Sequence, residues 1–314
     1  MKNLLTLVCI VCACIGFIGC GGCDEDISYK VFTRTDPRCS DYQGRYCSFI
    51  QDYSPEKPVN VEGKVIIGYD KSADTCTIFT NGIPNHDMND GDTKFANTPA
   101  PVYKAFTVTN SPTVDPTGPT ALSIKRYTAI LLNGAVVDLF ADGCCEGGED
   151  KKVGCDPSAS WRLNPMNAAA GYTTDKHNAH CQETGLYHYH GPPIGLYEYP
   201  STKVSPVIGF AADGYPIHGP YFEDDKGVIR EAKSGWKCCK DRPAAVDGCP
   251  SGTESDGKYI DDYYYDDADP DVDLDECNGM EVKGQYYYFV TSDYPYMVGC
   301  FMGKPDETFD HPSE

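Results

Sequence analysis

The residues in this sequence that are best suited to chemistry are histidines. Only seven occur in 314 residues, and four of them lie close together, at His177, His180, His188 and His190. Side chains alternate along a β-strand, so His188 and His190 would point to the same side of a strand. Two imidazoles on one strand face can bind copper or zinc. His180, across a short loop, is a candidate third ligand, and His218 is a candidate fourth.

A structural role would explain the same pattern. His188 and His190 could instead hydrogen-bond to backbone groups or tyrosine hydroxyls inside a polar core, because a His-x-His pair on a strand is not specific to metal sites. In either case Tyr187 and Tyr189 would face the opposite side. If a metal binds, the ring nitrogens of His180, His188 and His190 should lie about 3–4 Å apart.

A second group of candidate ligands is acidic. Residues 254–276 contain eleven carboxylates and one lysine, in a chain whose net charge is −21. Four aspartates alternate in this segment: Asp269, Asp271, Asp273 and Asp275. On an extended strand they would share one face and could bind calcium weakly. The run is not an EF-hand, because Leu274 and Met280 stand where Gly and Glu are required. The alternative is a solvated, flexible loop.

The negative charge also restricts the partners. Phosphates would be repelled, so nucleic acids and anionic membrane surfaces are not expected to bind. Divalent cations, a mineral surface and matrix proteins are the expected partners. Beyond the N-terminal run, no segment is long and apolar enough to predict a membrane span. Familiar catalytic motifs such as Gly-x-Ser-x-Gly and His-Glu-x-x-His are absent from the sequence.

Residues 1–20 are typical of a secretory signal peptide. Lys2 precedes an apolar run over residues 4–18, and small residues follow it. We therefore expect a secreted, extracellular protein. In an oxidising compartment, most of the thirteen cysteines beyond the leader should form disulfides. Their odd number leaves one thiol that is either free or bonded to another molecule, and Cys23 is the candidate.

The spacing of the cysteines suggests an internal repeat. Cys144-Cys145 is followed by Cys155 with the same spacing that separates Cys238-Cys239 from Cys249, and a tyrosine-rich strand follows each set. Because a bond between neighbouring cysteines is strained, each doublet should bond to two different partners. The two copies should then have equivalent disulfides.

We interpret this repeat as two related lobes. The first covers residues 60–195 and includes the histidine cluster. The second covers residues 196–303 and includes the acidic loop, 254–276. An N-terminal extension, 21–59, would precede them, and residues 304–314 would form a disordered tail.

Apolar and alternating runs predict strands more often than helices. The predicted strands are 61–69, 75–79, 186–190, 207–211 and 286–291. Asn133-Gly134 predicts a hairpin between the strands 127–132 and 135–140. Short helices are predicted only at 164–170 and 177–181. The expected fold class is therefore all-β or β-dominated, a globule stapled by disulfides.

Three segments resemble the YHYH-domain family. They are GLYHYHGPPIGLYEYP, SPVIGFAADGYPIHGPY and LDECNGMEVKGQYYYFVTSDYPYMVGCF, which together cover about residues 178–301. The resemblance implies that Tyr187, His188, Tyr189 and His190 form the family motif, with His180 and Asp213 as companions. The chain departs from the family at His218, where an aromatic residue is expected, and at 286–289, where a histidine is common.

Two functions from different classes follow. In overall character the chain is similar to acidic skeletal organic matrix proteins of stony corals, which implies a non-enzymatic extracellular matrix component that binds calcium or mineral in biomineralisation. The alternative is a secreted metalloprotein or metalloenzyme with copper or zinc at the YHYH histidines. We favour the first, because no motif supplies a nucleophile or a substrate pocket.

Overall fold

The computed structural model describes residues 25–26, 32–50, 61–92, 94–156, 158–252 and 254–311. The predicted signal peptide, residues 1–20, and Cys23 lie outside these residues. The prediction of a β-dominated fold is confirmed, since strands account for 33% of the residues and helix for 5%. The helical elements of the described part are four short 3-10 helices: η1 (Cys39–Tyr42), η2 (Ala168–Ala170), η3 (Ile260–Asp262) and η4 (Glu307–Phe309).

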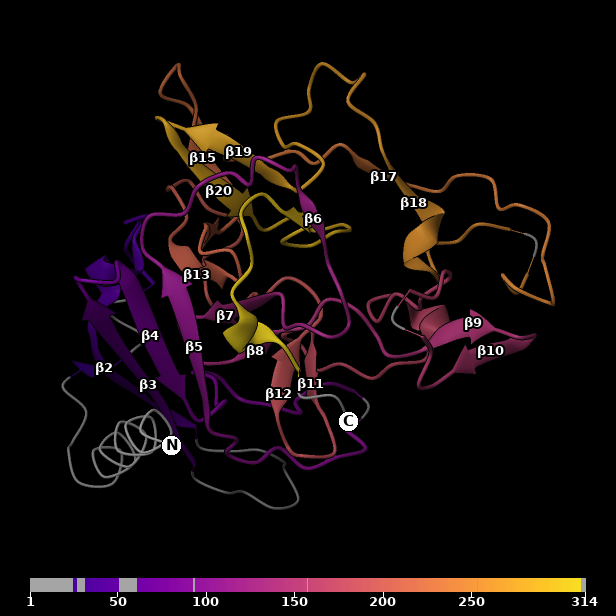
Figure 1. Cartoon of the computed structure of the whole chain (residues 1–314), viewed down its shortest axis with the longest axis horizontal. Helices are drawn as coiled ribbons and strands as arrows, with labels where there is room; N and C mark the ends of the chain where they lie inside the picture. The colour runs from indigo at the N-terminus through magenta and orange to yellow at the C-terminus, as the bar shows by residue number, and fades with distance from the viewer. Residues whose placement is uncertain are drawn as a thin grey trace.

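A five-stranded sheet forms the N-terminal part of the fold (Figure 1). In order across the sheet, its strands are β1 (Glu25–Asp26), β2 (Gly44–Ile50), β3 (Val61–Asp70), β4 (Thr75–Thr80) and β5 (Lys104–Thr109). Burial alternates along β3 and β4, so that Val65, Ile67 and Ile78 face the core. The segment predicted as an N-terminal extension therefore contributes β1 and β2 to this sheet.

An eight-stranded sheet lies at the centre of the molecule. Its order is β11-β12-β8-β7-β13-β14-β20-β19. The strands are β7 (Ala129–Leu131), β8 (Val136–Val137), β11 (Ala179–Cys181), β12 (Tyr187–Tyr189), β13 (Val207–Ala211), β14 (Pro216–His218), β19 (Gly279–Val282) and β20 (Gln285–Phe289). The first four come from the first predicted lobe and the last four from the second. Both segments thus join in one sheet.

The pairing of this sheet is the same in both directions from its centre, where β7 and β13 are antiparallel. On both sides the next pair is antiparallel, β7 with β8 and β13 with β14. The pair after it is parallel, β8 with β12 and β14 with β20. The outermost pair is antiparallel again, β12 with β11 and β20 with β19. The register also agrees, because Val137 lies beside Tyr189 as Ile217 lies beside Tyr288. We call β7, β8, β11 and β12 the first half-sheet and β13, β14, β20 and β19 the second half-sheet.

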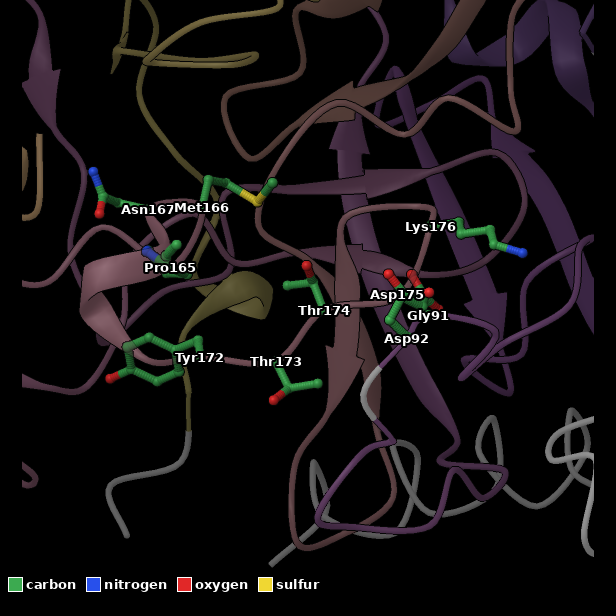
Figure 2. Close-up of a pocket in the computed structure, with 11 residues that line it drawn as sticks. Gly91, Asp92, Pro165, Met166, Asn167, Tyr172, Thr173, Thr174, Asp175 and Lys176 are labelled. Atoms are coloured by element: carbon green, nitrogen blue, oxygen red, sulfur yellow. The ribbon is translucent and has the colours of Figure 1, made fainter.

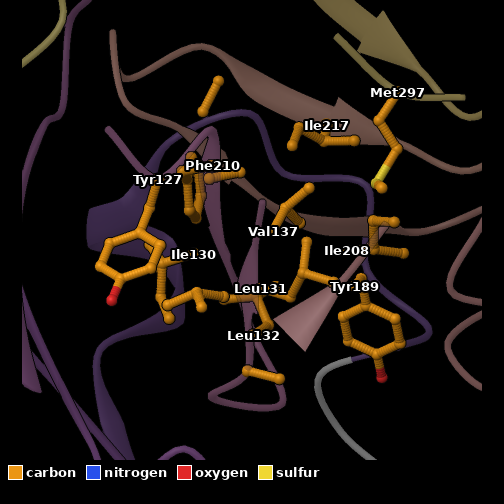
Figure 3. Close-up of a cluster of buried hydrophobic side chains, with 14 of the residues drawn as sticks. Tyr127, Ile130, Leu131, Leu132, Val137, Tyr189, Ile208, Phe210, Ile217 and Met297 are labelled. Carbon is orange, nitrogen blue, oxygen red and sulfur yellow. The ribbon is translucent and has the colours of Figure 1, made fainter. Parts of the chain in front are cut away.

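The core gathers around the central strands (Figure 3). Ile130, Leu131 and Phe210 are fully buried there. The predicted hairpin is confirmed, since Asn133-Gly134 connects β7 to β8. Gly134 has a φ of 89°, and a Cβ atom at this position would collide with the Oγ1 atom of Thr80 on β4. A glycine is therefore required where the hairpin packs against the five-stranded sheet.

The remaining strands form four small two-stranded sheets. These pair β6 (Thr120–Ala121) with β21 (Cys300–Phe301), β9 (Cys144–Glu146) with β10 (Glu149–Lys152), β15 (Tyr221–Glu223) with β16 (Ile229–Glu231), and β17 (Trp236–Cys238) with β18 (Tyr263–Tyr265). The helix predicted over 177–181 is wrong, because a turn and strand β11 occupy these residues.

The disulfides contradict the prediction that the two sets of cysteines are bonded in equivalent ways. Where both cysteines belong to the described part of the chain, they join Cys39 to Cys76, Cys144 to Cys155, Cys145 to Cys249, Cys238 to Cys239, and Cys277 to Cys300. The first doublet bonds to two partners, as predicted. The prediction is wrong for the second doublet, whose two cysteines bond to each other, so the two sets are not equivalent. Cys181 is a free, buried cysteine.

The strand register explains this error. In the two half-sheets, Cys181 corresponds to Glu281, because each faces the first tyrosine of its partner strand: Tyr187 or Tyr286. Matching Cys181 to Cys277, as the cysteine spacing did, therefore aligns residues that lie at different places in the sheet.

Residues 304–311 do not form the disordered tail that was predicted. They include η4, and Phe309 is completely buried with its ring 4.7 Å from that of Phe106. The backbone N–H of Tyr127 also donates to the carbonyl of Phe309. The buried ring of Phe309 and this hydrogen bond thus anchor the segment to the core. Among the residues described, no helix is long and apolar enough to cross a membrane.

Candidate metal centre

Three of the four candidate histidines converge on one face of the first half-sheet. His180 on β11 lies directly opposite His188 on β12, and His190 follows two residues later on the same side. The Nε2 atom of His190 is 3.0 Å from the Nε2 atoms of both His188 and His180. One ligand atom from each of the three histidines lies within 4.8 Å of the other two. These are the separations that a shared metal ion requires.

Backbone carbonyls determine the protonation of two of these rings. The Nδ1 atom of His180 lies 3.0 Å from the carbonyl oxygen of Thr173, and the Nδ1 atom of His188 lies 3.2 Å from that of Leu186. A carbonyl only accepts, so both Nδ1 atoms carry the proton and both Nε2 atoms present lone pairs. His190 can supply at most one proton to the cluster. The three imidazoles therefore cannot satisfy one another by hydrogen bonds alone.

Burial keeps the cluster neutral. His188 and His190 are each 3% exposed, and His180 is half-buried. Desolvation lowers the pKa of His188 to about 3, with a smaller contribution from His180, and it lowers the pKa of His190 and of His180 below the usual range for histidine. A neutral imidazole is the form that binds a metal ion.

The second half-sheet has apolar residues at the corresponding positions. Met280 pairs with Tyr287 as His180 pairs with His188. Phe289, which corresponds to His190, belongs to a hydrophobic cluster with Phe222 and Leu274, and Met280 and Tyr287 pack against that cluster. The scaffold therefore does not itself require histidines at this place.

The tyrosines of the motif face the other side of β12. The hydroxyl of Tyr187 donates to Asp175 over 2.8 Å, and the Nδ2 atom of Asn133 donates to the hydroxyl of Tyr189 over 2.9 Å. The Nε2 atom of His86 also bonds to the hydroxyl of Tyr189. No local pattern indicates that Asp175 and Asn133 bond to these tyrosines, because only the fold brings them together.

The other two histidines singled out from the sequence lie apart from the cluster. His177 stacks on His86 with ring centroids 3.6 Å apart. His218 belongs to the second half-sheet, where its ring contacts Tyr287 and Phe289 and its Nδ1 atom lies 2.9 Å from the carbonyl oxygen of Gly219. The structure does not bring His218 to the cluster, because the register of β14 places it opposite Phe289.

The alternating aspartates do not form an extended row. A turn begins at Asp269, whose side chain accepts from the backbone N–H of Asp271 over 3.0 Å. Asp273 forms a bidentate ion pair with Arg230, with both N···O distances 2.6 Å. Asp275 accepts from the backbone N–H of Gly279 over 3.0 Å. The prediction of one continuous acidic face is therefore wrong, while calcium binding itself stays a prediction.

A cavity of about 420 Å³ is lined in part by residues 172–174, which precede the histidine cluster in the chain (Figure 2). Its wall includes Tyr172, Thr173, Thr174, Met166 and Asp92. Two of these residues also adjoin His180. Thr173 provides the carbonyl for its Nδ1 atom, and the ring of Tyr172 lies 6.2 Å from its ring. Residues 172 and 173 thus link the wall of the cavity to His180, the half-exposed member of the cluster.

Comparison with known proteins places this sheet in a family. The model of a family described as YHYH protein matches residues 105–303, a region that contains all eight strands of the central sheet. The chain therefore belongs to the YHYH protein family, as its resemblance indicated. No curated protein and no solved structure matches the chain, so the similarity to coral matrix proteins gains no support.

Proposed function

We propose that this protein binds one divalent transition metal ion, copper or zinc, through the Nε2 atoms of His180, His188 and His190. The strongest support is the convergence of these three nitrogens, two of which belong to rings that carry their proton at Nδ1. Buried polar atoms that lack partners destabilise a fold. A bound ion would satisfy all three nitrogens at once.

The second half-sheet also supports this proposal. It builds the same strands in the same register with apolar side chains in place of the imidazoles. The scaffold does not need these histidines, and their burial costs free energy. Such residues are expected where the binding of a ligand compensates for that cost.

Three histidine ligands leave a fourth coordination position, as in catalytic zinc sites. The disulfides and the absence of a membrane-spanning helix from the described residues are compatible with an extracellular protein. An extracellular metalloprotein is thus the function that we propose.

Elemental analysis of protein purified without a histidine tag tests the proposal. Wild-type protein exposed to copper or zinc and then dialysed should retain one ion per chain. His188→Ala should retain none, and His218→Ala, which removes a buried histidine outside the cluster, should bind as wild type. Equal metal content in the His188→Ala and wild-type proteins would refute the site.

Calcium or mineral binding by a matrix component is the second candidate function. It is supported by the exposure of two aspartates that form only long ion pairs. The side chain of Asp271 is 76% exposed and lies 3.6 Å from the ammonium of Lys233, and that of Asp269 is 44% exposed and lies 3.8 Å from the ammonium of Lys237. Asp273 and Asp275 are engaged within the fold. If the exposed pair binds calcium in the range of about 10⁻⁴–10⁻³ M, calorimetric titration should show less heat for the Asp269→Asn/Asp271→Asn variant. Equal heats for this variant and wild type would eliminate the segment as a calcium site.

A further inference from the structure

We infer that Asp175 is a positioning residue of the histidine cluster, and this inference rests on the proposed metal site. The carboxylate of Asp175 is 5% exposed and connects two elements. Its Oδ1 atom accepts from the backbone N–H groups of His177 and Ala179, over 2.9 and 3.3 Å. Its Oδ2 atom accepts from the hydroxyl of Tyr187 over 2.8 Å.

These contacts lie one residue away from two of the proposed ligands. Ala179 immediately precedes His180 on β11, and Tyr187 immediately precedes His188 on β12. One carboxylate thus fixes the start of β11 relative to β12. Because the tyrosine and histidine side chains of β12 point to opposite faces, Asp175 acts through the backbone and does not contact the cluster.

The same arrangement occurs in the second half-sheet, where no histidine stands at the positions that correspond to His180, His188 and His190. Asp275 accepts from the backbone N–H of Gly279 over 3.0 Å and from the hydroxyl of Tyr286 over 3.0 Å. Asn178 and Asn278 close the two turns, with φ values of 64° and 66°, and each donates its backbone N–H to the carbonyl of the aspartate three residues earlier. Asp275 therefore serves as a control within the same chain. A change at Asp275 shows what the loss of this aspartate does to the fold where no proposed ligand is nearby.

Metal affinity should depend on Asp175 because a site with three ligands tolerates little displacement, about 0.5 Å. Release of the start of β11 would move the Nε2 atom of His180 away from those of His188 and His190. Loss of outer contacts of this kind typically weakens metal binding about 10–100-fold. The corresponding change at Asp275 would release β19, which carries no ligand.

The test compares Asp175→Asn with Asp275→Asn in the full chain, with Tyr187→Phe as a milder variant. Zinc affinity is measured by competition with a chelator, and thermal unfolding is measured alongside. We expect both aspartate variants to lower the melting temperature, while only Asp175→Asn and Tyr187→Phe weaken zinc binding, by about 10–100-fold. Equal affinities of Asp175→Asn and wild type, or equal losses in the two aspartate variants, would overturn the inference.

A second measurement separates this inference from the metal proposal. In metal-free protein, the imidazole NMR resonances of His180, His188 and His190 should shift in Asp175→Asn and stay unchanged in Asp275→Asn. If wild-type protein binds neither zinc nor copper, the proposed function fails, but these resonances still decide the role of Asp175. Unshifted resonances in Asp175→Asn would contradict the positioning role whatever the zinc result.

Discussion

His188 occupies in the first half-sheet the position that Tyr287 occupies in the second. Each lies opposite a residue of the edge strand, His180 or Met280, in the same register of an antiparallel pair. One scaffold thus presents three imidazoles at one end and packs apolar side chains at the other. Comparing the two half-sheets therefore shows how the three histidines change the stability and the binding properties of the same scaffold.

Replacing the histidines with their counterparts, as His180→Met/His188→Tyr/His190→Phe, should stabilise the metal-free protein by about 1–3 kcal/mol, because it removes buried polar nitrogens that lack partners. The free energy of unfolding from urea titration measures this change. A clear loss of stability in the metal-free protein would instead indicate that the histidines have a structural role.

Zinc provides the control for this replacement. A ligand that binds only the folded state stabilises it by about 2.7 kcal/mol at a hundredfold excess over Kd. Wild-type protein should gain stability when zinc is added, and the triple variant should gain none. The same gain in both proteins would place the bound zinc outside the cluster.

The disulfide between Cys145 and Cys249 should stabilise the fold more than the one between Cys144 and Cys155. The first closes a loop with a sequence separation of 104 residues and the second one with a separation of 11. In the chain-entropy model, a longer loop gives a larger stabilisation, about 4–5 kcal/mol for 100 residues and about 3 for 15. Paired Cys→Ser variants, compared by denaturant unfolding, test this order. The reverse order would show that local packing dominates.

Asp213 should make stability depend on pH. Desolvation by burial raises the pKa of its carboxyl to about 6, although Tyr288 and Gly303 donate hydrogen bonds to it. The folded state therefore holds this proton more tightly than the unfolded state does. The resulting stabilisation is complete below about pH 4 and is lost as the pH rises through about 6, a change of roughly 3 kcal/mol.

Asp213→Asn provides the comparison for this prediction, because Asn133 already occupies the corresponding position in the first half-sheet. The free energy of unfolding of wild type minus that of the variant should fall between pH 4 and pH 6. A difference that is constant over this range, or that rises, would contradict the prediction.

Local patterns in the sequence predicted much of the site. The alternation of residues 187–190 placed His188 and His190 on one face, and Asn133-Gly134 predicted the hairpin beside them. These features depend on neighbouring residues only. The bond between Tyr187 and Asp175 depends on how the turn before β11 meets β12, so no local pattern indicates it.

The wrong predictions, for the alternating aspartates and for the cysteine doublets, also concern contacts between residues that are distant in sequence. Arg230, which neutralises Asp273, lies far from it in sequence, and the ion pair forms only because the fold brings the two together. The alternating aspartates therefore looked more extended and more solvated than they are. The cysteine doublets misled in the same way, because chain topology and not spacing decides which cysteines meet.

X-ray absorption spectroscopy of the zinc-loaded protein tests the central claim most directly, because it reports the type and number of ligands around the ion. The proposed site predicts three imidazole nitrogens at about 2.0–2.1 Å with one further light ligand, and the loss of this signature in His190→Ala. A spectrum with fewer than three imidazoles, or with oxygen ligands alone, would contradict the account and would place the ion elsewhere on the protein.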